Sequence, residues 1–111
     1  MSSAPNIGTQ GEQAGLARWK ADPGLTQMRV RLLADLSIAL VERGRASRLV
    51  VEPNGEAVLM LRPVWKERPV GVVVIQTGTD GWAYLWDGTP RRVVKGMADV
   101  RAAAAALVVA R

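Results

Sequence analysis

Apolar residues between Gly24 and Arg43 recur at steps of three and four, which places them on one stripe of an α-helix. This stripe, which should face the core, contains Leu25, Met28, Leu32, Leu33, Leu36, Ala39 and Leu40. A second apolar set of Val30, Ala34, Ile38 and Val41 follows the opposite side, and Gly44 is placed to cap the helix. Because the helix is apolar on two sides, we expect it to have two neighbours.

After Gly44 the pattern changes from helical to extended. Segments rich in Val, Leu and aromatic residues are separated by turns that contain Gly, Pro, Asn or Asp, and they read "RLVVE", "EAVLMLR", "VGVVVIQT", "WAYLWD" and a short fifth, "RRVV". The connections are too short for a parallel crossover, so the strands should form an antiparallel meander. The chain then returns to helix from Met97 or Asp99 onward, with a core stripe of Met97, Val100, Ala104, Leu107 and Val108.

This order predicts an α+β domain of two layers. A four- to five-stranded antiparallel meander is flanked in sequence by an N-terminal and a C-terminal helix. One domain should cover residues 15–111, whereas residues 1–14 contain too few apolar side chains to offset their ordering entropy and are expected to form a flexible tail. The N-terminus lacks the pattern of a signal peptide and no apolar run suits a membrane span, so we expect a cytoplasmic protein without membrane association.

The composition excludes several kinds of chemistry. The chain has no Cys and no His, which removes disulfides, thiolate zinc sites, cysteine nucleophiles and the usual general base. The segment "GTDG", Gly78 to Gly81, is followed by a strand pattern and not by the helix that a phosphate loop requires, so it predicts a hairpin turn. We therefore expect no enzyme activity, no catalytic residues, no metal and no cofactor.

The segment "GWAYLWDG" gathers two tryptophans and the only tyrosine of the chain. Side chains alternate across a strand, so Trp82, Tyr84 and Trp86 share one face of the sheet. Three interpretations remain open at this stage. The row could be core beneath a helix, a protein interface, or a platform on which a small molecule or a nucleic-acid base stacks.

Both faces of the predicted sheet are apolar, while two helices can cover only one of them. A second copy of the chain in a two-fold dimer would complete the burial, through the sheet, the back of the first helix, or both. The candidate interface residues are Trp82, Tyr84, Trp86, Val30, Ala34, Ile38 and Val41. The sequence thus predicts a non-enzymatic binding or regulatory module that acts through protein–protein contacts as a homodimer.

The formal net charge of +5 permits an alternative partner. Surplus basic residues in the second half of the chain are candidates for anion binding, namely Arg62, Lys66, Arg68, Arg91, Arg92 and Lys95. They are either solvated side chains that keep the protein soluble or a patch that attracts an anion through a salt-sensitive field. In the second case the protein would be a nucleic-acid-binding accessory protein that uses a basic sheet edge.

Three segments also carry a resemblance to a known group: "LLADLSIALVERGRASRLVVEPNGEAVLMLRP", "GWAYLWDGTPRRV" and "ADVRAAAAAL". Together they resemble small uncharacterised actinobacterial proteins with an N-terminal helix, a meander that ends in a Gly-Trp-x-x-x-Trp strand, and an Ala-rich final helix. The shared features are hydrophobic patterns and turns, which are less specific than a catalytic signature. The resemblance implies the helix, meander and helix order, and it carries over no activity and no site residue.

Overall fold

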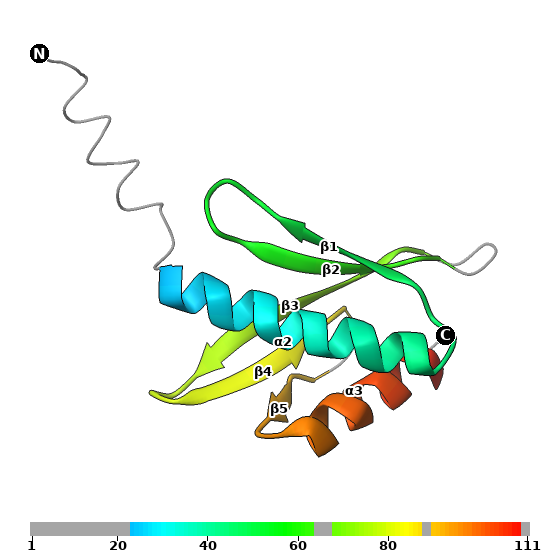
Figure 1. Ribbon diagram of the computed structural model, residues 1–111. Coiled ribbons are helices and arrows are strands. Elements are labelled where there is room, and N and C mark those ends of the chain that lie inside the picture. The colour runs from blue at the N-terminus through cyan, green and yellow to red at the C-terminus, as the bar shows by residue number, and fades with distance from the viewer. Residues whose placement is uncertain (1–22, 64–67, 88–89, 110–111) are drawn as a thin grey trace, which may run out of the picture.

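The computed structural model describes residues 23–63, 68–87 and 90–109, and Figure 1 shows how their elements are arranged. Two helices enclose five strands in the chain order α2 (Pro23–Glu42), β1 (Ser47–Val51), β2 (Ala57–Leu61), β3 (Val70–Thr77), β4 (Gly81–Leu85), β5 (Arg92–Val94) and α3 (Met97–Val109). The order predicted from the sequence is confirmed, including the short fifth strand. The predicted tail of residues 1–14 lies outside the described residues.

The five strands form one sheet in the order β1-β2-β3-β4-β5, and every neighbouring pair is antiparallel. The sheet is therefore the predicted meander. The long central strand β3 pairs with a different neighbour along each part of its length. Val70 to Val72 pair with β2, and Val73 to Thr77 pair with β4.

Both helices lie on the same face of the sheet, and α2 crosses it beside α3 (Figure 1). This covered side, the inner face, holds the core. Buried residues of α2 (Leu33, Leu36, Ala39, Leu40) and of α3 (Val100, Ala103, Ala104, Leu107) meet buried residues of the strands there. The two-layer α+β fold is thus confirmed. Met97, predicted for the core stripe of the second helix, is instead 45% exposed, because it lies in the first turn at the rim of the layer.

The end of α2 fixes the direction in which the chain enters the sheet. Gly44 has φ +78°, a conformation that favours glycine, and its N–H donates to the Val41 carbonyl at 2.9 Å. The N–H of Arg45 donates to the Leu40 carbonyl at 2.8 Å, which completes a Schellman motif. The predicted cap at Gly44 is confirmed, and β1 begins three residues later.

Candidate interaction surfaces

The aromatic row of β4 lies on the inner face. Tyr84 is 0% exposed and Trp86 is buried as well, whereas Trp82 is half-buried. The register explains the placement, because Tyr84 pairs with the buried Val74 and therefore points to the same side. Of the three interpretations left open, the structure places Tyr84 and Trp86 in the core beneath the helices. Their side chains are not available on the surface of the subunit.

Tyr84 also ties the two layers together. Its hydroxyl donates a hydrogen bond to the backbone carbonyl of Leu32 in α2, with 2.6 Å between the oxygens. Burial, reinforced by the negative charge of Asp35, raises the pKa of the Tyr84 phenol above its ordinary value of 10.0. The phenol therefore keeps its proton in the folded chain and remains a donor to the helix.

The opposite side of the sheet, the outer face, is predominantly apolar and carries one charged strand residue, Arg48, at its β1 margin. Alternation and register assign it Val50, Val58, Met60, Val73, Ile75, Ala83, Leu85 and Val93. Most of these side chains are half-buried, while Ala83 is 0% exposed and Val93 is 49% exposed. No helix or strand in the described part of the chain lies over them. An antiparallel sheet with one solvated face normally carries polar residues there, so this face is unusual.

The middle of the outer face is closely packed. A Cβ on Gly71 would come within 3.2 Å of the Met60 sulfur and 3.3 Å of a Val58 methyl group. These two side chains of β2 thus fold over the glycine of β3 and fill the space that a side chain would occupy. At Gly71, apolar side chains of β2 therefore fill the outer face above β3.

The second predicted interface set runs along one flank of α2. Val30 and Ala34 are half-buried, but Ile38 and Val41 are 62% and 63% exposed. The hydroxyls of Ser37 and Ser47 lie 2.8 Å apart, which joins this flank to the beginning of β1. The exposed apolar flank of α2 therefore borders β1, which is an edge strand of the sheet.

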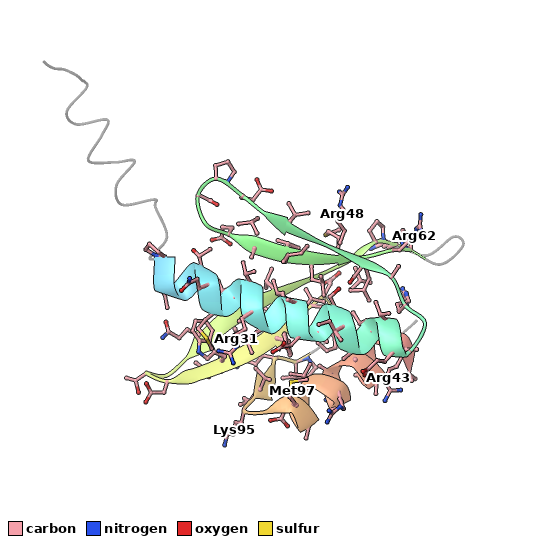
Figure 2. The ribbon with its side chains drawn as sticks, in the orientation of Figure 1. Arg31, Arg43, Arg48, Arg62, Lys95 and Met97 are labelled. Atoms are coloured by element: carbon pink, nitrogen blue, oxygen red, sulfur yellow. The ribbon has the colours of Figure 1, made fainter. Side chains whose placement is uncertain are left out.

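The basic residues predicted to bind anions do not form one patch. Arg62 and Arg68 lie near each other, at the end of β2 and before the start of β3. Arg92 stands at the same end of the sheet but on β5, three strands away from β2, and Arg91 directly precedes it. Lys95 follows β5 at the opposite end. Figure 2 shows Arg62 on the β1–β2 side of the molecule and Lys95 on the far side. Lys66 lies outside the described residues.

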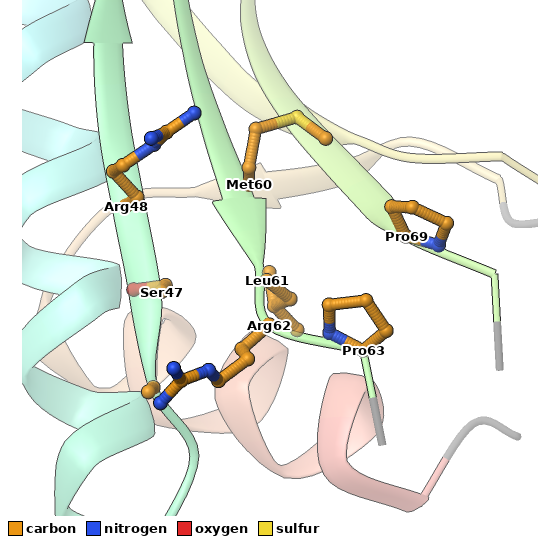
Figure 3. A pocket seen from close by; sticks show the side chains of 8 residues that line it. Ser47, Arg48, Met60, Leu61, Arg62, Pro63 and Pro69 are labelled. Atoms are coloured by element: carbon orange, nitrogen blue, oxygen red, sulfur yellow. The ribbon is translucent and has the colours of Figure 1, made fainter. Parts of the chain in front are cut away.

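Arg62 forms part of a shallow hollow of about 430 Å³ at that end of β1 and β2. Figure 3 shows that Arg48, from β1, and Met60, from β2, extend on the same side of the sheet, with Pro63 and Pro69 closing the other wall. Arg45, behind the hollow, is buried and donates from Nε and Nη2 to the Arg62 carbonyl at 3.4 and 3.3 Å. The hollow thus combines an apolar floor with two guanidinium groups at its rim.

A second hollow of about 630 Å³ lies between α2, β4 and the start of α3. Its apolar lining includes Trp82, Leu32 and Met97, and charged side chains stand around it, among them Arg31 and Lys95. Trp82 is the member of the aromatic row that reaches solvent. The interpretation as a stacking platform therefore applies to this one side chain.

Within the described ranges, no group of three or more acidic side chains is placed to hold a metal ion. None of the helices described is long and apolar enough to cross a membrane.

The candidate interface residues predicted from the sequence include the tryptophan row and none of the outer-face residues of β2 and β3. The alternation in β2 and β3 already separated Val58 and Met60 from Leu59, and Val73 from Val72. The alternation does not show which of the two faces the helices cover. The hydroxyl of Tyr84 indicates that face, because a buried tyrosine needs an acceptor and a helix backbone can supply one.

Comparisons of the chain with protein-family models, with characterised proteins and with solved structures gave no match. The helix, meander and helix order implied by the resemblance to actinobacterial proteins is present in the structure.

Proposed function

We propose that the protein is a non-catalytic binding module that acts through protein–protein contacts, and that it forms a homodimer through the outer face of its sheet. The observation that carries the proposal is the apolar character of that face, on which no described element packs. Large contiguous apolar patches on soluble proteins mark sites of interaction. A second copy supplies a face of identical shape and chemistry, and two-fold pairing is the commonest arrangement of homo-oligomers.

Sheet-on-sheet packing provides the geometry of this dimer. Two outer faces would stack about 10 Å apart, with their strands aligned to within roughly 30°. Val73 and Ile75, on the central strand, would lie in the middle of the contact. Tyr84 and Trp86, which the sequence predicted as interface residues, lie in the core on the inner face and would not take part in this contact.

Sedimentation of the purified chain at micromolar concentration tests the proposal. We expect a particle of at least two copies. Ile75→Lys should raise the dissociation constant of the outer-face dimer by about a hundredfold or more, because the substitution buries an unpaired charge in an apolar contact.

Gln76→Lys is the matched control. Gln76 is the next residue on β3, its exposed side chain points away from the outer face, and the substitution adds the same charge. We expect the Gln76→Lys variant to sediment as a particle with the same number of copies as the wild type. A wild-type chain that sediments as a monomer contradicts the proposal, and so does an Ile75→Lys variant that assembles as the wild type does.

A second candidate function is nucleic-acid binding at the basic end of the sheet. The observation that favours it is the hollow that Arg48 and Arg62 help to line. Pro69 also lines this hollow, and Arg68 precedes Pro69 in the chain. Binding of labelled single-stranded DNA or RNA would then weaken steeply with salt, and Arg62→Ala should reduce the slope of log affinity against log salt by about 1. The absence of binding at low salt would remove this candidate.

A further inference from the structure

The two edges of the sheet differ in how they are protected. An edge strand presents unpaired N–H and C=O groups that can pair with another chain, and proteins usually shorten, cover or interrupt such edges. β5 has three residues, follows Pro90, and packs beside α3. β1 has five residues and contains neither proline nor glycine. Figure 1 shows β1 at the margin of the sheet, with α2 alongside.

The hydrogen bonds at the two ends of β1 show which of its backbone groups are free to pair. The Ala46 carbonyl accepts from the Arg62 N–H at 3.0 Å, and the Glu52 N–H donates to the Glu56 carbonyl at 2.7 Å. In an antiparallel ladder, hydrogen-bonded positions alternate along the strand. The even-numbered residues of β1 therefore face β2. Ser47, Leu49 and Val51 direct their N–H and C=O groups toward the open edge.

We propose that this edge pairs with β1 of a second copy, through a two-fold axis at Leu49, and joins two sheets into one of ten strands. The free positions suit such pairing because they are symmetric about Leu49. In antiparallel register, Leu49 stands opposite Leu49 of the second copy, and Ser47 stands opposite its Val51. Each of these pairs can exchange two backbone hydrogen bonds.

The exposed apolar side chains on this edge complement one another in the same arrangement. Val41 is 63% exposed and lies one helical turn beyond Ser37, whose hydroxyl is 2.8 Å from that of Ser47. Val51, at the other end of the strand, is 49% exposed. Because the register sets Val51 of the second copy against Ser47, it brings that valine close to Val41. Within one copy, Val41 of α2 lies beside the start of β1, whereas Val51 lies at its end. The two valines therefore meet only between two copies whose β1 strands run antiparallel.

Charges on the outer side of the edge also fit this register. Arg48 lies opposite Val50 of the second copy, and the Glu52 of that copy lies diagonally across, with about 7–8 Å between Cα atoms. This distance is within reach of the long arginine side chain. The carboxylate offsets the repulsion between the two copies of Arg48, which lie diagonally across the axis.

The edge contact is separate from the outer-face contact, so mass measurements distinguish the two. Val51→Lys places a cation on a position that is half exposed in the subunit, and it should raise the dissociation constant of the edge contact at least about tenfold. Adding Val41→Glu should restore assembly, because the new carboxylate meets the ammonium group that Val51→Lys introduces in the second copy. Val109→Lys, on the exposed end of α3, is the control and should change nothing.

With both contacts intact, the particle should contain more than two copies, and it closes at four copies if the two two-fold axes cross at right angles. Ile75→Lys should leave a dimer held by β1, Val51→Lys a dimer held by the outer face, and the two substitutions together a monomer. If Val51→Lys assembles as the wild type does, the edge proposal is overturned while the proposed function stands. If Ile75→Lys has no effect but Val51→Lys yields a monomer, the outer-face proposal fails and the edge proposal stands.

A cysteine variant tests the register directly, since the chain has no cysteine of its own. Leu49→Cys should form a disulfide-linked dimer under mild oxidation, because paired strand positions lie about 5.5 Å apart at Cα, within the span of a disulfide. Val109→Cys is the control and should remain uncrosslinked. The register is wrong if Leu49→Cys does not crosslink while the wild type assembles through β1.

Discussion

The inner and outer faces of the sheet have similar side chains and different surroundings. On β3, Val72 and Val74 of the inner face lie beneath the helices and are buried. Val73 and Ile75 of the outer face are shielded only by their neighbours in the sheet. Two helices suffice for one face of five strands, and no helix or strand in the described ranges covers the other face. Apolar residues thus stabilise this fold on one side and, in the proposed dimer, provide the surface for assembly on the other.

An apolar side chain contributes to stability in a different way on each of the two faces. On the inner face a side chain contributes to folding at any protein concentration, because its contacts lie within the subunit. On the outer face of the proposed dimer, the full contribution requires a second molecule, so it depends on concentration. Substitutions on the two faces can therefore be told apart by dilution.

The largest difference is expected between neighbours on one strand. Val72→Ala removes two methyl groups from a 0% exposed position and should lower the free energy of unfolding by about 2 kcal/mol or more, from lost burial plus the cavity that remains. Val73→Ala, its matched control on the outer face, should cost about 1 kcal/mol or less in dilute solution. Urea unfolding at two protein concentrations measures both.

The cost of Val72→Ala should not change with dilution, whereas that of Val73→Ala should grow as concentration rises. Equal costs for both variants, independent of concentration, would mean that the outer face has no partner.

A smaller effect is expected from the bond that joins the inner face to α2. Tyr84→Phe removes the donor to the Leu32 carbonyl and should cost about 1–2 kcal/mol at neutral pH. The cost should shrink above pH 10. There the unfolded chain releases the phenolic proton, but the folded chain retains it because burial raises the pKa of Tyr84. The wild type should therefore lose about 1.4 kcal/mol per pH unit relative to the variant.

Denaturant unfolding of both proteins between pH 8 and pH 11 checks this prediction. A constant difference across that range would show that Tyr84 is not held in its neutral form by the fold.

The smallest effect concerns the joint that directs the chain from α2 into the sheet. Gly44→Ala forces a residue with a Cβ into φ +78° and should cost about 1 kcal/mol. Gly44→Asn should cost less, because asparagine tolerates this conformation better. Thermal unfolding of the two variants measures the difference. Identical melting temperatures for both variants would show that the joint contributes nothing through its backbone conformation.

Much of this fold could be predicted from the sequence because its signals are local. The three- and four-residue steps from Leu25 to Leu40 specify a helix, and the glycine at position 44 marks its end. Short turns such as that at Pro53 to Gly55 leave adjacent strands no arrangement other than antiparallel. These features depend on neighbours in the chain, and the structure has all of them.

The candidate surfaces were harder to predict because they depend on contacts distant in sequence. Trp86 carries the chemistry of an interface residue, yet it is buried in the core, because it follows β4 directly and continues the alternation that places Tyr84 on the inner face. Val73 belongs to one of the two apolar faces that the alternation separates, and its place on the uncovered face follows from which face α2 packs against. Alternation showed that two apolar faces exist, but the identity of the covered one comes from packing.

The division of β3 between two partners has a consequence for how the molecule opens. Only three register pairs, from Leu59 with Val72 to Leu61 with Val70, connect the β1–β2 hairpin to the remaining strands. The two parts of the sheet are thus joined by one short paired segment of β2 and β3, and α2 contacts strands of both parts. When that helix frays, the hairpin can detach as a unit. Its amide protons should then exchange with solvent earlier than those shared by β3 and β4.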